Sequence, residues 1–187
     1  MIRAFLKVAA VLLFVLLLIS VVYYMKFRPD TDTRFGNLKE LVSAVQKADN
    51  VVLYEGLPHP GHTPGLLDKE LKSKRTVQIH GFPFYEESLQ LKEADAKRLS
   101  ELYCDPQSFK RFSGEKKCGG FHPDFCIEWH MGTTEYHVLI CLGCYEIKSF
   151  GPKVELYCDV TDDARKQFKA VLTTYYKNRP KAGRPDD

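Results

Sequence analysis

The sequence predicts an α+β fold in which an antiparallel four-stranded meander, at about 124–160, is covered by helices. Apolar and polar residues alternate along this region, which is the period of a strand with one buried face. Turn residues interrupt the alternation three times, and a segment with helical spacing of apolar residues follows it. The chain has 187 residues, of which 44% are hydrophobic, so it can form one globular domain with a substantial core.

The first 28 residues predict a transmembrane helix. Residues 8–25 carry no charge, and the stretch from Ala4 to Met25 would extend ~33 Å as a helix, enough to cross a hydrocarbon core of ~30 Å. A cleaved signal peptide has a shorter apolar stretch and ends in a pair of small residues at a set spacing, and no such pair follows the apolar stretch here. We therefore expect a single-pass protein with an uncleaved signal-anchor, held in the lipid bilayer through residues 4–25.

Two features of the sequence give opposite indications for the orientation of the predicted anchor. Basic residues lie on both sides of the span, and counting them slightly favours a cytoplasmic domain. N-terminal anchors that precede one folded domain nevertheless usually leave that domain outside. We therefore expect the C-terminal domain to be extracytoplasmic.

Charge composition argues against nucleic-acid binding. The first 28 residues contain four basic and no acidic residues, so the remainder has 23 basic and 24 acidic residues. A nearly neutral domain with interspersed signs offers no basic stripe for phosphates. We expect no nucleic-acid partner.

Polar residues at 29–37 predict a linker that leads to a globular domain at 38–177, and a polar tail is expected at 178–187. The domain begins with apolar residues at the spacing of one helical face. These residues are Leu38, Leu41, Val42 and Val45.

Two strands are expected before the meander, at 51–55 and 76–80, from their β-branched and aromatic residues. The segment 56–65 contains three Pro and three Gly and is expected to be a loop. A helix from about Lys92 is expected to end just before Pro106, because proline disfavours helical backbone at the preceding residue.

Three tight turns set the predicted register of the meander. They are centred on Thr133-Thr134, Leu142-Gly143 and Gly151-Pro152. The resulting pairs are Trp129 with Val138, Ile127 with Ile140, Ile140 with Tyr145, and Ile147 with Leu156. The large apolar side chains then share one face, with Leu139 as the exception, and a last helix beginning after Thr161 should cover that face.

The same register places a cysteine cluster on the outer face of the sheet. Cys126 would face Cys141 across the first hairpin, with Cys144 facing Cys141 across the next turn. Cys118 can fold back to join them. The C-x-x-C between two strands resembles a zinc-knuckle hairpin more than a redox motif, which needs a helix start.

Three states of these thiols remain open. Four thiolates, or three thiolates and the imidazole of His122, can hold a structural zinc ion. Cys126–Cys141 and Cys118–Cys144 can instead form disulfides in an oxidising compartment. In the third state the thiols are reduced and partly buried.

No catalytic motif is evident. Glycine-rich phosphate loops, G-x-S-x-G and H-E-x-x-H are all missing from the sequence. His130 and His137 are expected to face each other as a surface pair, about 13 Å from Cys126 and thus too far to share a metal with the thiols. An enzyme would most naturally have its site in the loop 56–65, beside His80.

One segment resembles a known group of proteins. The run CGGFHPDFCIEW, followed by LICLGCYEIKSFGP and a closing helix that ends in KNRP, resembles uncharacterised bacterial membrane-anchored proteins over roughly 118–180. The resemblance implies a bacterial origin. It carries no known activity and no functional residues.

The sequence therefore predicts a membrane-anchored, non-catalytic domain with an interaction or structural role, which can include a protein partner. The alternative is a metal-binding, zinc-knuckle-like or thiol-redox protein. That alternative uses Cys118, Cys126, Cys141 and Cys144, with zinc as its only expected cofactor.

Overall fold

A computed structural model of the chain describes residues 16–17, 20, 33–61, 63–114, 116 and 119–184. The chain divides into two units, 1–33 and 34–187. In the described ranges, no helix combines the length and the apolar character needed to cross a membrane. Apart from residues 16, 17 and 20, the predicted anchor lies outside the described residues.

The second unit is α+β, as predicted. Its helices are α2 (Thr33–Val45), α3 (Leu66–Ser73), α4 (Glu93–Cys104) and α5 (Asp162–Leu172), with 3-10 turns η1 (Pro106–Ser108), η2 (Thr173–Tyr175) and η3 (Lys181–Gly183). Its strands are β1 (Asn50–Glu55), β2 (Thr76–Ile79), β3 (Phe82–Tyr85), β4 (Phe109–Arg111), β5 (Phe125–Met131), β6 (Thr134–Cys141), β7 (Glu146–Gly151) and β8 (Val154–Val160).

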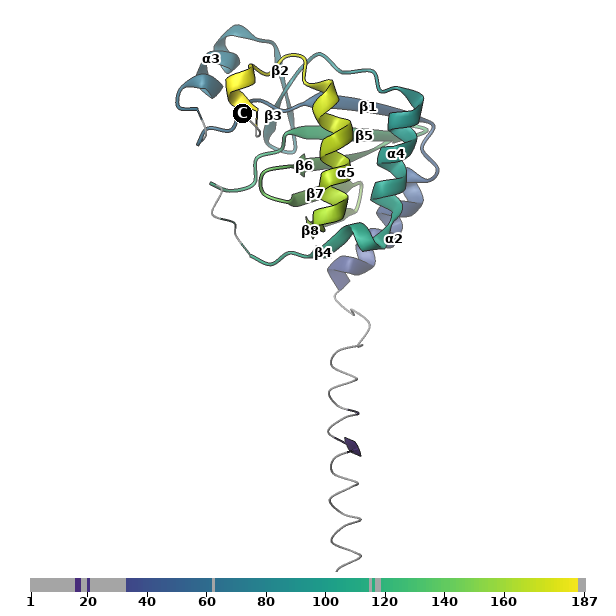
Figure 1. Cartoon of the computed structure of the whole chain (residues 1–187). Coiled ribbons are helices and arrows are strands. Elements are labelled where there is room, and N and C mark those ends of the chain that lie inside the picture. Colours follow the sequence, from purple (N-terminus) through teal and green to yellow (C-terminus); the bar gives the residue numbers. More distant parts are fainter. Residues whose placement is uncertain are drawn as a thin grey trace, which may run out of the picture. The chain divides into compact units, whose positions relative to one another are not determined.

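Six strands form one antiparallel sheet in the order β1-β5-β6-β7-β8-β4 (Figure 1). The predicted meander is β5 to β8, and the predicted strand at 51–55 adds to its edge as β1. The predicted strand at 76–80 does not join this sheet. It forms a separate hairpin with β3.

The register of the meander differs from the predicted one by two residues at every turn. The observed pairs are Ile127 with Val138, Trp129 with Tyr136, Ile140 with Ile147, and Ile147 with Cys158. The first turn is a two-residue hairpin turn at Gly132-Thr133, in which Gly132 has a φ of 59°. A shift of two residues leaves every side chain on its predicted face, whereas a shift of one would have reversed them all.

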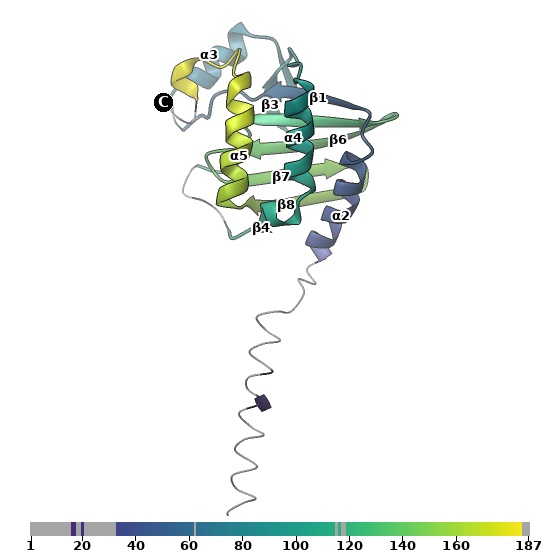
Figure 2. The ribbon, with the colours of Figure 1, turned by 45° about the vertical axis from the view of Figure 1, so that its right-hand side comes forward.

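Helices α4 and α5 lie side by side across the inner face of the sheet (Figure 2). Trp129, which was predicted to lie on this face, is 1% exposed there. The N-terminus of α5 is capped as expected, because the Thr161 hydroxyl accepts a hydrogen bond from the backbone N–H of Ala164.

The outer face carries a second, smaller apolar cluster beneath the β2–β3 hairpin. Leu139, the exception in the predicted pattern, is fully buried there with Cys126. Ile79 and Phe84 of the hairpin complete the cluster. The hairpin therefore covers part of the face on which the cysteine cluster was expected.

The chain after α5 returns to the sheet and is fixed there by a buried carboxylate. Glu55, at the end of β1, is 0% exposed. Its oxygens accept hydrogen bonds from the backbone N–H groups of three consecutive residues at distances of 3.1, 2.7 and 2.9 Å. These residues are Lys177, Asn178 and Arg179.

Arg179 adds a buried ion pair to this attachment. It falls within the segment predicted to be a polar tail, 178–187, yet it is only 1% exposed. Its Nη1 lies 2.6 Å from Oδ1 of Asp124, while Nε and Nη2 donate to the carbonyls of Gly56 and Leu57, each at 2.8 Å. The C-terminal segment is thus part of the folded domain at least as far as Arg179.

Candidate functional site

Glutamate and histidine side chains gather on the outer face, where β5 and β6 pair. Glu128 and His130 come from β5, and Glu135 and His137 come from β6. The register sets Glu128 opposite His137 and His130 opposite Glu135. The prediction that His130 faces His137 was therefore wrong, because the two-residue shift gives each imidazole a carboxylate partner.

Glu128 is the centre of this group. Its side chain is 11% exposed and each of its oxygens contacts a different imidazole. Oε1 lies 2.7 Å from Nε2 of His130, and Oε2 lies 2.9 Å from Nε2 of His137. The hydrogen bond from His137, with a smaller contribution from His130, lowers the pKa of the Glu128 carboxyl although burial opposes this. Glu128 is consequently an anion at neutral pH.

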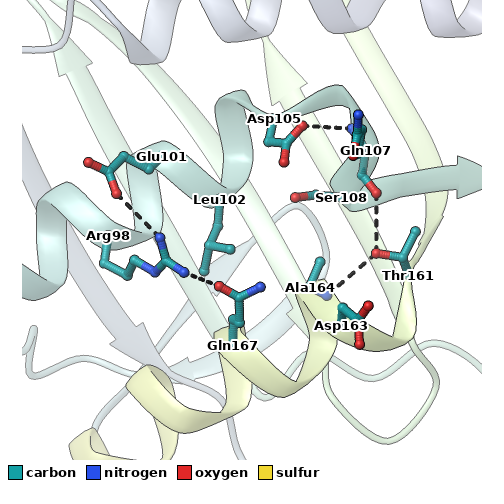
Figure 3. A pocket seen from close by; sticks show the side chains of 10 residues that line it. All are labelled: Arg98, Glu101, Leu102, Asp105, Gln107, Ser108, Thr161, Asp163, Ala164 and Gln167. Atoms are coloured by element: carbon teal, nitrogen blue, oxygen red, sulfur yellow. Dashed lines mark hydrogen bonds and ion pairs between the residues drawn. The ribbon is translucent and has the colours of Figure 1, made fainter.

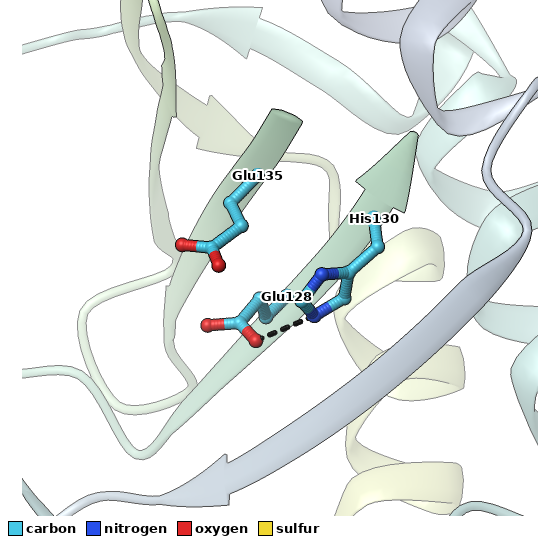
Figure 4. Close-up of side chains that lie close together, drawn as sticks. All are labelled: Glu128, His130 and Glu135. Atoms are coloured by element: carbon cyan, nitrogen blue, oxygen red, sulfur yellow. Dashed lines mark hydrogen bonds and ion pairs between the residues drawn. The ribbon is translucent and has the colours of Figure 1, made fainter. Parts of the chain in front are cut away.

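Three side chains of this group have the spacing of metal ligands. One ligand atom from each of Glu128, His130 and Glu135 lies within 4.8 Å of the other two. Figure 4 shows the imidazole and both carboxylates around a common space. No other set of three Cys, His, Asp or Glu residues in the described part of the chain has this spacing.

The ligand types of this cluster indicate a particular class of metal. Imidazole nitrogen combined with carboxylate oxygen suits zinc and other late divalent transition metals. Magnesium and calcium favour sites made of oxygen alone. Three protein ligands would leave a coordination position for water or for a further side chain.

Two further side chains border the cluster. Tyr54 of β1 has its pKa raised, first by burial and then by the negative charge of Glu128. His80 lies in the turn between β2 and β3, where its ring is stacked on Phe150 with centroids 3.8 Å apart and planes at 8°. The same ring meets His137 edge to face, with centroids 4.9 Å apart.

The predicted thiol cluster is not assembled as expected. Cys126 lies opposite Leu139 and not opposite Cys141, again because of the register shift. Cys126 and Cys141 are free thiols, and Cys144 is disulfide-bonded. Cys118 lies outside the described residues, so the four-thiol zinc site is not seen as such.

The two free thiols of this region are poorly suited to redox or metal chemistry. Burial, followed by the charge of Asp124, raises the pKa of Cys141 to about 12. Burial also raises the pKa of Cys126 well above its ordinary value. Because the thiolate is the nucleophile and the metal ligand, these side chains behave as core residues.

His122, the predicted substitute ligand for zinc, is engaged elsewhere. Its Nε2 lies 2.7 Å from the carbonyl oxygen of Leu57, to which it donates. Its ring meets that of His59 edge to face, with centroids 5.0 Å apart. Burial lowers the pKa of His122, which favours the neutral form in this position.

Cysteine mapping gives a direct prediction for this region. After unfolding without reductant, we expect Cys104, Cys126, Cys141 and Cys158 to be alkylated and Cys144 to remain protected. Peptide mapping should find Cys144 linked to Cys118, the pairing that the sequence left open. A peptide that links Cys126 to Cys141 would contradict the structure.

A cleft of about 530 Å³ lies elsewhere, between α4 and α5 (Figure 3). Several of its polar groups already have partners. The Arg98 guanidinium contacts both Glu101 and Gln167, and the Thr161 hydroxyl caps α5. Such a cleft is best explained as the seam between two packed helices.

No family model, curated protein or solved structure shows a significant match to the chain. The resemblance to bacterial membrane-anchored proteins therefore stays a prediction. The function of the domain has to be argued from its own geometry.

Sequence reasoning overlooked Glu128, Glu135 and the contact of His80 with His137, although a signal for the two glutamates was present. Each arm of the first hairpin contains the triplet Glu-aromatic-His, as EWH at 128–130 and EYH at 135–137. In an antiparallel hairpin, such triplets bring two Glu and two His residues onto one face.

Proposed function

We propose that this chain is a membrane-tethered, non-catalytic domain that binds a divalent transition-metal ion, in the first place zinc. The supporting observation is the placement of ligand atoms from Glu128, His130 and Glu135 within 4.8 Å of one another. Two adjacent strands hold these residues, and strands position ligands more rigidly than loops do.

The electrostatics of the cluster support this proposal. Glu128 is largely buried and has a lowered pKa, so it presents a negative charge at neutral pH. A buried carboxylate is costly unless a cation or hydrogen-bond donors compensate for it. Two imidazoles supply that compensation in the structure, and a bound cation would supply more.

Thiol chemistry is less well supported as the function. Cys126 and Cys141 are 0% and 3% exposed, and their pKa values are raised by burial. Cys126 and Cys141 do not face each other in the sheet. We therefore assign the cysteines a structural role.

Zinc titration of the full-length chain, purified in detergent without chelator, tests the metal site. We expect the wild type to bind zinc and Glu128→Gln to lose binding. The His130→Gln variant should bind at least about 100-fold more weakly, beyond the roughly 10–100-fold typical of outer-shell partners.

Glu86→Gln is the matched control, because Glu86 is an exposed carboxylate whose side chain is 57% accessible. It should leave zinc affinity unchanged. The emission of Trp129, which is buried on the opposite face, reports whether each variant is folded. A folded wild-type protein without zinc affinity would refute the proposal.

The membrane tether rests on the sequence of residues 4–25. We expect the full-length protein to fractionate with membranes and to resist extraction by carbonate, because this segment is long and apolar enough to span a bilayer. Mass spectrometry should find the N-terminal region intact. A mature protein that starts near Val21 would instead indicate a cleaved signal peptide.

A further inference from the structure

Resting on the proposed function, we propose that His137 is a positioning residue of the metal site and sets its preference for zinc. The imidazole of His137 holds one oxygen of Glu128, so that only the other oxygen faces the metal together with His130 and Glu135. A carboxylate restricted to one oxygen favours a four-coordinate ion such as zinc over manganese, which prefers six oxygen-rich ligands.

The hydrogen bond between His137 and Glu128 is built into the sheet. The two residues lie directly opposite each other on β6 and β5. Nε2 of His137 lies 2.9 Å from Oε2 of Glu128. Because an ionised carboxylate can only accept, the imidazole is the donor. The side chains are 15% and 11% exposed, so water competes little for this contact.

His137 is a partner of a ligand and lies outside the ligand set itself. In the described part of the chain, the group of three side chains with ligand spacing is Glu128, His130 and Glu135. His130 lies 2.7 Å from Oε1 of Glu128, whereas His137 bonds to Oε2. The two oxygens of Glu128 therefore have separate tasks, one beside the other ligands and one held by His137.

The packing around His137 fixes the direction of this hydrogen bond. The ring of His80 meets the His137 ring edge to face, with centroids 4.9 Å apart. Phe150 of β7 pairs with His137 on the side away from β5. These neighbours restrict the imidazole and keep Nε2 directed at Glu128.

Zinc binding would replace only one of the two hydrogen bonds of Glu128. The ion would take the place of the proton between Oε1 and Nε2 of His130, because an imidazole nitrogen must be deprotonated to bind a metal. The hydrogen bond from His137 would persist and continue to satisfy the buried Oε2. Outer-shell donors of this kind orient a ligand, and their removal typically weakens metal binding about 10–100-fold.

The same hydrogen bond limits the number of ligands. With Oε2 engaged, Glu128 contributes one oxygen to the metal. Three protein ligands and one water make the tetrahedral set that zinc adopts in open sites. If Oε2 is released, Glu128 can bind through both oxygens, which suits ions with higher coordination numbers.

The experiment compares zinc and manganese affinities of the full-length protein, purified in detergent without chelator, by competition with a chromophoric chelator. We expect His137→Leu to lose about 10–100-fold in zinc affinity and less in manganese affinity. His137→Gln should stay near the wild type, because its amide N–H can reach Oε2. Cobalt, used as a probe, should give intense four-coordinate visible bands in the wild type and His137→Gln, and weak bands in His137→Leu.

Glu155→Gln is the matched control, since Glu155 is an exposed carboxylate on the same face, two strands beyond His137. It should change neither affinity, and the emission of buried Trp129 should confirm that all variants are folded. Equal losses in His137→Gln and His137→Leu, or wild-type behaviour of both, would refute the positioning role and leave the proposed function intact. A wild type that does not bind zinc would refute the proposed function itself.

Discussion

Replacing Arg179 with Met is expected to lower the free energy of unfolding by about 3–5 kcal/mol, because it leaves Asp124 as an uncompensated buried charge. The guanidinium is 1% exposed and the carboxylate 7%. Arg179 also donates to the carbonyls of Gly56 and Leu57. A methionine has similar length but satisfies none of these acceptors.

Urea denaturation followed by far-UV circular dichroism measures this loss. Lys177→Met is the matched control in the same segment, since Lys177 forms an exposed pair with Glu87 in which the side chains are 58% and 57% accessible. Such surface pairs contribute about 0–1 kcal/mol. If the two substitutions cost the same, the buried attachment of the C-terminal segment would be disproved.

A double variant separates charge from packing. Asp124→Asn keeps a side-chain oxygen for the hydrogen bond from the Leu142 N–H, and it removes the negative charge. Combined with Arg179→Met, it should cost less than the sum of the two single changes, because no buried charge is left unpaired.

The faces of the sheet could be predicted from the sequence, but its pairing could not. The alternation of apolar and polar residues along a strand has a period of two, so it determines on which face of the sheet each side chain lies. The pairing depends on where each turn is centred, and Gly132-Thr133 replaced the expected Thr133-Thr134. Moving the turn by one residue shifts the pairing by two, which left Trp129 on the buried face and moved Cys126 away from Cys141.

The same shift in pairing determines which side chains meet in the candidate site. With the predicted turn, His130 faces His137 and the nearby glutamates have no role. With the observed turn, both imidazoles approach Glu128. The contact of His80 with His137 depends on a hairpin that folds back over the sheet from another part of the chain, and local sequence patterns do not encode that contact.

The role of Arg179 could not be predicted from local sequence patterns either. The segment KNRP reads as solvent-exposed because it is polar. Its partners, Glu55 and Asp124, are 124 and 55 residues away along the chain. Buried polar residues of this kind are recognised only once their long-range partners are known.

Replacing Trp129 with Ala is expected to cost about 3–5 kcal/mol of unfolding free energy, much of the stability of a small domain. The indole is 1% exposed, and its Nε1 donates to the hydroxyl of Ser100 on α4 at 3.3 Å. Its ring packs against Tyr103 with centroids 5.4 Å apart. Truncation therefore removes contacts between the sheet and α4 and leaves a cavity in the core.

Met131→Ala is the matched control, because Met131 belongs to the same strand and face but is only half-buried near the hairpin turn. It should cost about 1 kcal/mol, the typical value for a point substitution. Unfolding is followed by far-UV circular dichroism, since the variant lacks the only tryptophan of the chain. Equal costs for the two variants, or an emission maximum of exposed tryptophan in the native wild type, would contradict the observed face of β5, because burial of Trp129 requires the face opposite Glu128 and His130.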